Sequence, residues 1–114
     1  MTSTVEPRVA ERLLRLIGLG VRARNVVVGV EQVRTAAKRG SLEFAVVAPD
    51  ASANSREKIV PLLRARRVKF VEGPTAAELG AAVGREQTAA VGVVDPQLAR
   101  GIRDLIRTSV ADDS

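Results

Sequence analysis

Apolar residues along the chain alternate between helical spacing and short continuous runs. Spacings of three and four residues are typical of amphipathic helices, whereas short β-branched runs are typical of strands buried in a sheet. We expect helices over residues 8–19, 30–39, 56–67 and 75–83 and from 96 onward, and strands over 25–28, 44–48, 68–72 and 88–94. The predicted order is therefore α-β-α-β-α-β-α-β-α.

Capping residues predict where several of these elements begin and end. Gly40 follows the second helix, at the position where a left-handed residue commonly ends a helix. Thr75 and Glu78 match a capping box, in which each residue binds the other's backbone N–H at the start of a helix. Asp95 followed by Pro96 predicts the cap and the first residue of the last helix.

The segment before the third helix and the helix itself raise two further points. Residues 49–55 are rich in turn-forming residues, and we expect a loop there with Asp50 capping its own turn. Pro61 falls inside the predicted helix 56–67. Because proline has no N–H to donate, it fits either in the first turn or at a kink. The sequence leaves both placements open.

Regular alternation of helices with buried strands indicates the α/β class. It predicts a three-layer α/β/α sandwich, in which helices cover both faces of a central sheet. At 114 residues, the chain suits one domain over 8–108, with tails at 1–7 and 109–114. The sequence shows no targeting segment and no apolar run near the roughly 18 residues of a membrane span. We therefore expect a soluble cytoplasmic protein.

Composition narrows the chemistry that the chain can perform. Eighteen Lys and Arg against thirteen Asp and Glu give a net charge of +5, and fifteen of the cations are arginine. The chain has no cysteine, histidine, tryptophan or tyrosine. These absences exclude thiol and imidazole catalysis and the usual zinc sites, and they disfavour ring stacking on single strands. Two interpretations of the charge stay open: binding of folded nucleic acid, or an arginine-rich solvated surface.

Motifs for nucleotide binding and catalysis do not fit the predicted elements. Gly18-Leu-Gly20-Val-Arg-Ala23 matches a dinucleotide fingerprint, but a helix precedes it and a strand follows, the reverse of the order required. We interpret Gly18 and Gly20 as ending the first helix. Asp50, Asp95 and Asp104 have no visible partners for acid–base catalysis. The sequence predicts no enzyme, no cofactor and no metal.

Cations bracket Gly29, where the first strand leads directly into the second helix. They are Arg22, Arg24, Arg34, Lys38 and Arg39. A helix start offers N–H groups and a positive dipole end to phosphates, which favours anion binding. The alternative is ordinary surface spacing with Glu31 as a partner. A second cluster, Arg64-Ala-Arg66-Arg67, is interpreted as complementing the negative end of the third helix.

Five sequence motifs occur along the chain in an order that resembles the pattern of one protein family. They are Leu16-Ile-Gly18-Leu-Gly20-x-Arg22-Ala23; Gly29-x-Glu31-Gln32-Val33-x-x-Ala36-x-x-Arg39-Gly40; Ala45-Val46-Val47-Ala48-x-Asp50-Ala51-Ser52; Val68-x-Phe70-Val71; and Glu78-Leu79-Gly80-x-Ala82-x-Gly84. The set resembles the kink-turn RNA-binding superfamily that includes large-subunit ribosomal proteins of the "seven Ae" type, and within it the small bacterial YlxQ-like branch. The resemblance covers roughly residues 10–108.

This resemblance implies a mixed four-stranded sheet and binding to a sharply bent RNA. The helix after Gly29 is expected to enter the widened groove at the bend, and the loop after Gly84 to cover an extruded nucleotide. The family's Asn, Glu and Lys readout positions are occupied here by Glu31, Gln32 and Thr35. Loss of the lysine removes one cation, so the salt-dependent part of binding is expected to be weaker.

We expect an RNA-binding, ribosomal-protein-like chain that recognises a structured, kink-turn-like RNA by shape and phosphate contacts. The expected partner is structured RNA, with ribosomal RNA as one candidate. The candidate residues are Arg22, Arg24, Gly29, Glu31, Gln32, Thr35, Arg39, Ser52, Arg85, Glu86, Gln87 and Thr88. Arg22, Arg24 and Arg39 are expected on phosphates, whereas the Gly29 backbone, Gln32, Thr35 and the loop 85–88 are expected nearest the bases. The alternative is a protein-interaction adaptor on the same fold that docks an acidic partner.

Overall fold

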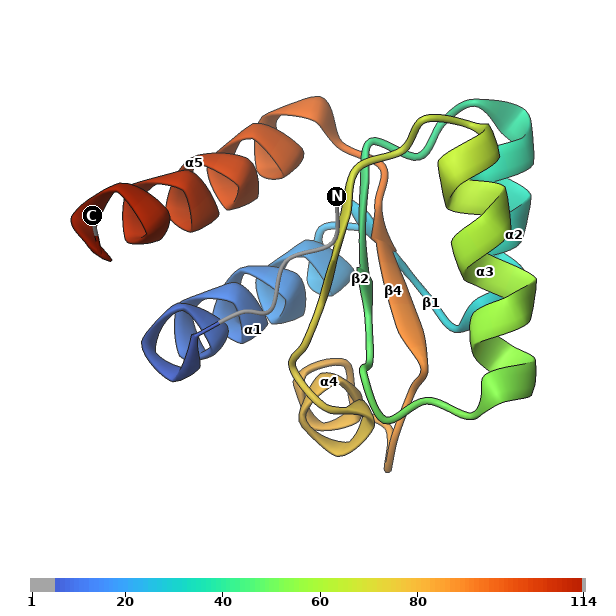
Figure 1. The fold of residues 1–114 in the computed structure, drawn as a ribbon, viewed down its shortest axis with the longest axis horizontal. Coiled ribbons are helices and arrows are strands. Elements are labelled where there is room, and N and C mark those ends of the chain that lie inside the picture. Colours follow the sequence, from blue (N-terminus) through green and yellow to red (C-terminus); the bar gives the residue numbers. More distant parts are fainter. Residues whose placement is uncertain (1–5, 114) are drawn as a thin grey trace.

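Four short strands form a mixed sheet at the centre of the computed structural model, which describes residues 6–113 (Figure 1). The strands are β1 (Val26–Val28), β2 (Phe44–Val47), β3 (Phe70–Glu72) and β4 (Ala90–Val93). Their order is β1-β4-β2-β3; β4 is antiparallel to both of its neighbours, and β2 is parallel to β3. The mixed four-stranded sheet is confirmed.

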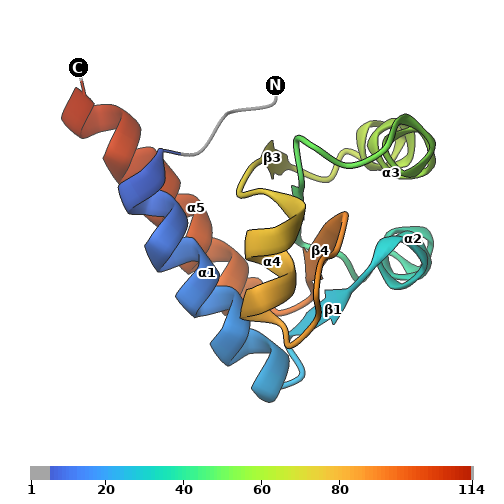
Figure 2. The ribbon, with the colours of Figure 1, turned by 90° about the horizontal axis from the view of Figure 1, so that it is seen from below.

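Helices cover both faces of this sheet. They are α1 (Pro7–Arg22), α2 (Val30–Arg39), α3 (Ala53–Ala65), α4 (Ala76–Ala82) and α5 (Pro96–Asp113). Helices α2 and α3 lie on one face, and α1, α4 and α5 lie on the other (Figure 2). The predicted order of elements and the three-layer sandwich are therefore confirmed.

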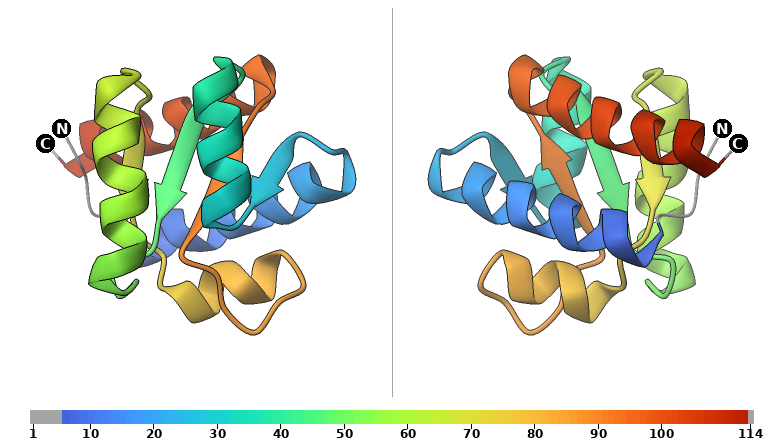
Figure 3. Two further views of the ribbon diagram at one scale, coloured as in Figure 1. Left: turned by 90° about the vertical axis from the view of Figure 1, so that its right-hand side faces the viewer. Right: turned by 90° about the vertical axis from the view of Figure 1, so that its left-hand side faces the viewer.

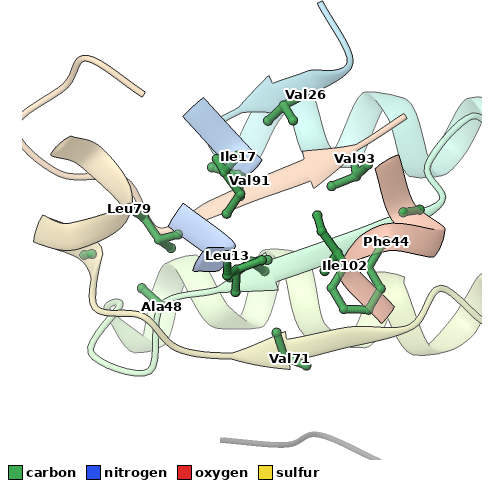
Figure 4. Close-up of a cluster of buried hydrophobic side chains, with 13 residues drawn as sticks. Leu13, Ile17, Val26, Phe44, Ala48, Val71, Leu79, Val91, Val93 and Ile102 are labelled. Carbon is green, nitrogen blue, oxygen red and sulfur yellow. The ribbon is translucent and has the colours of Figure 1, made fainter. Parts of the chain in front are cut away.

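The alternation of side chains along the strands divides the core into two clusters, one on each face. In β2, Phe44 and Val46 belong to the cluster under α1, α4 and α5, whereas Ala45 and Val47 belong to the cluster under α2 and α3. Leu13 and Ile102 meet the first cluster from α1 and α5 (Figure 4). All four β2 residues are buried, which explains their continuous apolar run.

The prediction that Gly18 and Gly20 end the first helix is wrong, because α1 continues through both to Arg22. These glycines instead permit close packing. A Cβ on Gly20 would lie 2.5 Å from Val26 Cγ2, and one on Gly18 would lie 3.1 Å from the Ala82 carbonyl oxygen. Glycine is therefore needed at these two positions because neighbouring segments pack closely against the helix, and not because the helix ends there.

Helix α3 begins three residues earlier than the predicted residue 56. Ser52 is its N-cap, because the Ser52 hydroxyl oxygen accepts from the Ser55 backbone N–H at 3.1 Å. The end of the predicted loop is therefore the first turn of the helix. Pro61 lies in the interior of α3, so its placement in the first turn is wrong.

Helix α4 begins with the predicted capping box of Thr75 and Glu78, and both of its hydrogen bonds are present. The prediction that Asp50 caps its own turn is wrong. Asp50 Oδ1 instead accepts from the Ala76 backbone N–H at 2.8 Å, across 26 residues of chain. Two side chains from different loops therefore satisfy the first N–H groups of this seven-residue helix.

We expect Asp50→Ala to lower the free energy of unfolding by about 0.5–2 kcal/mol, the usual effect of losing an N-cap acceptor. The alanine leaves the Ala76 N–H without its carboxylate partner. Chemical denaturation measured by circular dichroism tests this. Asp50→Asn keeps an acceptor oxygen and should recover most of the loss; equal losses in both variants would contradict the capping role.

Helix α5 begins as predicted, with Pro96 first and the Leu98 N–H donating to Asp95 Oδ2 at 2.8 Å. It continues to Asp113, so the backbone of residues 109–113, which were assigned to the tail, is helical. Neither glycine nor proline follows Gly101 to stop the helix. Helix α1 begins at Pro7, one residue before the predicted helix. Residues 1–5 and 114 of the predicted tails lie outside the described residues, and the predicted limits of the domain stay a prediction. No helix within 6–113 is long and apolar enough to cross a membrane.

Candidate functional site

Three of the predicted site segments lie at one edge of the sheet. Strands β1, β2 and β3 run in the same direction and β4 runs against them. Their carboxyl ends therefore meet the start of β4 at one edge, which we call the carboxyl edge (lower part of Figure 1). It carries Gly29, Ser52 and the loop 84–88.

Gly29 joins β1 to α2 without an intervening loop. Its φ and ψ of 94° and 159° are accessible to glycine and strongly disfavoured for other residues. The Gly29 N–H donates to the Ala90 carbonyl at 2.9 Å, and the Gly29 carbonyl accepts from Val33 N–H at 3.0 Å. The glycine thus turns the chain sharply, so that α2 begins at the carboxyl edge with its positive dipole end there.

Arg85 lies beside this helix start. Its Nη1 atom is 3.9 Å from the position that a Cβ on Gly29 would occupy. Residues 29 and 85 are distant in sequence, and the sequence alone predicted their proximity only through the family resemblance. An exposed guanidinium next to the start of a helix provides two adjacent features that attract a phosphate.

The loop that carries Arg85 is held against α4 by backbone hydrogen bonds. The Arg85 N–H donates to the Gly80 carbonyl at 2.8 Å, and the Thr88 N–H donates to the Ala76 carbonyl at 3.0 Å. The contact requires glycine at 80, because a Cβ there would lie 2.5 Å from Gln87 Cα and 2.6 Å from its nitrogen. Gly80 therefore sets the path of the loop.

Thr88 differs from the other candidates in this loop because it is buried. Its exposed fraction is 7%, and its hydroxyl donates to the Ala90 carbonyl at 3.2 Å. The Thr88 side chain is therefore occupied within the fold, and its place among the RNA-binding residues stays a prediction. Arg85, Glu86 and Gln87 are exposed and remain candidates.

One face of α2 carries four of the predicted residues. Glu31, Gln32, Thr35 and Arg39 line an open groove beside β1, together with Val27 and Val94. Gln32 Oε1 accepts from the Val28 N–H at 3.0 Å, and the amide N–H groups of this exposed residue provide two further donors. The Thr35 hydroxyl donates to the Glu31 carbonyl at 3.0 Å. This groove extends the site along the helix.

Arg22 and Arg24 do not lie with Gly29. They precede β1, whose three residues separate them from the carboxyl edge by about 10 Å. Arg39 ends α2, about 15 Å along the helix from its start. Arg22, Arg24 and Arg39 therefore lie away from the Gly29 junction, although Arg39 lines the far end of the groove beside α2. Their expected contacts with phosphates stay a prediction.

Two other predicted residues make contacts that stabilise the fold. The Ser52 side chain caps α3, although it is exposed at the carboxyl edge. Arg34 Nη1 donates to the Lys58 carbonyl at 2.5 Å and so joins α2 to α3. The sequence interpretation missed the structural role of Arg34 because its partner lies 24 residues away. Among residues 6–113, no group of three acidic side chains is placed to hold a metal ion.

Comparison with known proteins identifies clear relatives of this chain. A model of the ribosomal protein L7Ae/L30e/S12e/Gadd45 family matches residues 11–102. The RNA-binding protein YlxQ of Bacillus subtilis (strain 168) is 29% identical over 91 residues, which cover 80% of this chain and 91% of that protein.

Solved structures show the same fold. A protein of unknown function from Bacillus halodurans has a TM-score of 0.75 and 28% identity, over 82% of this chain and 95% of that one. The Giardia lamblia 15.5 kD RNA-binding protein has a TM-score of 0.77 and 18% identity, over 95% of this chain and 92% of that one. At 18% sequence identity, the similarity to the Giardia protein shows a shared fold only.

Proposed function

The chain belongs to the ribosomal protein L7Ae/L30e/S12e/Gadd45 family, and from this membership we propose that it is an RNA-binding protein specific for a structured, sharply bent RNA. The YlxQ relative, similar over most of both chains, is named as an RNA-binding protein. The proposed action is to bind and stabilise one RNA geometry without chemical change to the RNA. We further propose cytoplasmic RNA as the target, with ribosomal RNA as the first candidate.

The observation that carries this proposal is the proximity of Arg85 to Gly29 at the start of α2. Backbone N–H groups of the first turn, the helix dipole and a guanidinium all favour an anion at one point. A phosphate of the RNA backbone has the charge and the acceptor oxygens to occupy it. Such a contact positions the RNA without reading its sequence.

The exposed face of α2 supports recognition of a bend. The major groove of regular A-form RNA is too narrow for side chains to read, so a helix requires a place where the groove is widened. With a phosphate held at Gly29, the face of Glu31, Gln32 and Thr35 is directed toward that opening. The Gln32 amide and the Glu31 carboxylate then offer a donor and acceptors to base edges.

Titration of a kink-turn RNA and an unbent duplex of equal length, each at two salt concentrations, tests the function. The bent RNA is expected to bind more tightly at both concentrations, because its shape fits the α2 surface. Equal weak binding of the two RNAs would overturn shape recognition. Protein partners that survive ribonuclease treatment in a pull-down, with no preference for bent RNA, would instead support the adaptor alternative.

Arg85→Ala is expected to weaken binding of the bent RNA roughly tenfold and to lower the salt slope by about one, as for loss of one phosphate contact. Fluorescence titrations across salt concentrations measure both quantities. Arg100→Ala is the matched control, because Arg100 is exposed on α5 and lies away from the groove beside α2. Equal losses in the two variants would contradict a specific role for Arg85.

A further inference from the structure

A second basic surface lies at the other end of the molecule, between β3, the end of α3 and α5. We call it the β3–α5 pocket. It is an open hollow of about 530 Å³ lined by Phe44, Arg64, Arg67, Val68, Lys69, Phe70, Val71, Arg103, Ile106 and Arg107. Five of these ten side chains are cationic and none is acidic. Figure 3 shows α5 running toward the β3 edge of the sheet.

Local helix electrostatics do not account for this cluster. Arg64 complements the negative end of α3, as the sequence predicted for its segment. Lys69, however, lies next to β3, and Arg103 and Arg107 come from α5, more than 30 residues later. The fold has therefore gathered cations from three elements around one hollow.

The backbone at Arg67 adds a second observation. Its φ of 57° is in the left-handed region, which residues other than glycine seldom adopt. The Arg67 N–H donates to the Arg64 carbonyl at 3.1 Å, so a tight turn ends α3 here. Glycine is the residue favoured at such a turn, yet this chain has an exposed arginine that lines the pocket.

The β3–α5 pocket is separate from the site at Gly29. It lies at the edge of the sheet where β3 begins, whereas Gly29 and Arg85 lie at the carboxyl edge. The two outer strands, β1 and β3, are also three strand spacings apart, about 14 Å. One phosphate group cannot contact both sites, but an RNA with two helical segments can.

We infer that the β3–α5 pocket binds the phosphate backbone of a second RNA segment, such as a stem that continues beyond the bend. This inference rests on the proposed function. Arg103 and Arg107 lie one helical turn apart, about 6 Å along α5, so they present two positive groups in a row. A polyanion neutralises five mutually repelling cations more completely than a single small anion does.

The test uses the full chain and an unbent RNA duplex of 12 base pairs as the probe. Arg103→Gln with Arg107→Gln is compared with Arg8→Gln with Arg12→Gln on α1. Both pairs have the same i,i+4 spacing and the same loss of charge, and Arg8 and Arg12 lie outside the pocket. The first pair is expected to lower the salt slope by about two and duplex affinity at low salt roughly tenfold. The control pair should change affinity less than twofold.

Signals from the arginine Nε–H groups in nuclear magnetic resonance provide a second measurement in the unmodified protein. Duplex binding is expected to shift those of Arg64, Arg67, Arg103 and Arg107 more than those of Arg8 and Arg12. Equal effects of the two variant pairs, or equal shifts across all arginines, would overturn the inference and indicate diffuse charge binding.

The outcomes separate this inference from the proposed function. Arg85→Ala should lower the preference for bent RNA while leaving duplex binding intact. The double variant Arg103→Gln with Arg107→Gln, which we call the pocket pair, should lower the affinities for bent RNA and for the duplex together. If bent RNA is not preferred but the pocket pair still weakens duplex binding, the proposed function fails and the β3–α5 pocket stands. If bent RNA is preferred and the pocket pair changes neither affinity, the inference fails alone.

Discussion

Replacing Gly29 with alanine is expected to weaken binding of the bent RNA at least tenfold, or about 1.4 kcal/mol. The backbone at Gly29 has φ of 94° and ψ of 159°, a region that a Cβ makes costly by about 1–3 kcal/mol. The new Cβ would not clash, since its nearest neighbour, Arg85 Nη1, is 3.9 Å away. The strain therefore acts on the backbone, and its relief changes the path of the chain into α2 and with it the position of the helix start relative to Arg85.

Gly40→Ala is the matched control for this variant. Gly40 lies at the other end of α2, also has a positive φ, 76°, and has no atom within 4 Å of the position that a Cβ would occupy. The substitution should lower the free energy of unfolding by about 1 kcal/mol but leave RNA affinity unchanged. Titration calorimetry with denaturation curves measures both properties. RNA affinity that falls equally in the two variants would show that stability, and not the geometry of the Gly29 junction, controls binding.

The helix that forms the site could be predicted from sequence because its limits are local. Gly29 and Gly40 bound α2 at the predicted residues, and Val33, Ala36 and Ala37 make its buried face. The spacing of these apolar residues depends only on the geometry of one helix. The capping box of Thr75 and Glu78 was predictable for the same reason, since both partners lie within one turn.

Contacts between distant segments could not be predicted in this way. Asp50 caps α4 across 26 residues, and Gly20 is required by Val26 and Leu98, which lie outside its helix. The sequence shows an acid and a glycine, but it does not show the atom that each will meet. Local rules therefore assigned both residues to the nearest turn or helix end, and both assignments were wrong.

The positions of the arginines also depend on contacts between distant segments, which the sequence does not show. Arg22 and Arg24 are close to Gly29 in sequence, yet β1 carries the chain away from them. Arg103 and Arg107 are far from Arg64 in sequence and line the same pocket. The excess of cations in the sequence favours binding of a polyanion. Which cations lie together, and therefore where the polyanion binds, depends on how the fold arranges the strands and helices. The family resemblance supplied the pairing of Gly29 with the loop 85–88, but not the β3–α5 pocket.

Gly80→Ala is expected to weaken binding of the bent RNA roughly tenfold by displacing the loop that carries Arg85. A Cβ at residue 80 would lie 2.5 Å from Gln87 Cα, 2.6 Å from Gln87 N and 2.8 Å from the Glu86 carbonyl carbon. All three are backbone atoms, which cannot rotate aside as a flexible side chain does. The loop must move outward, at a cost of about 1–3 kcal/mol in unfolding free energy.

Gly101→Ala provides the control, because it places the same methyl group in another helix where no atom lies within 4 Å. That variant should gain about 0.5–1 kcal/mol from the better helix propensity of alanine and bind RNA as the parent does. Combining Gly80→Ala with Arg85→Ala separates loop position from charge. If Gly80 acts by positioning Arg85, the double variant should bind RNA no more weakly than the weaker single variant; additive losses would show that Gly80 acts by another route.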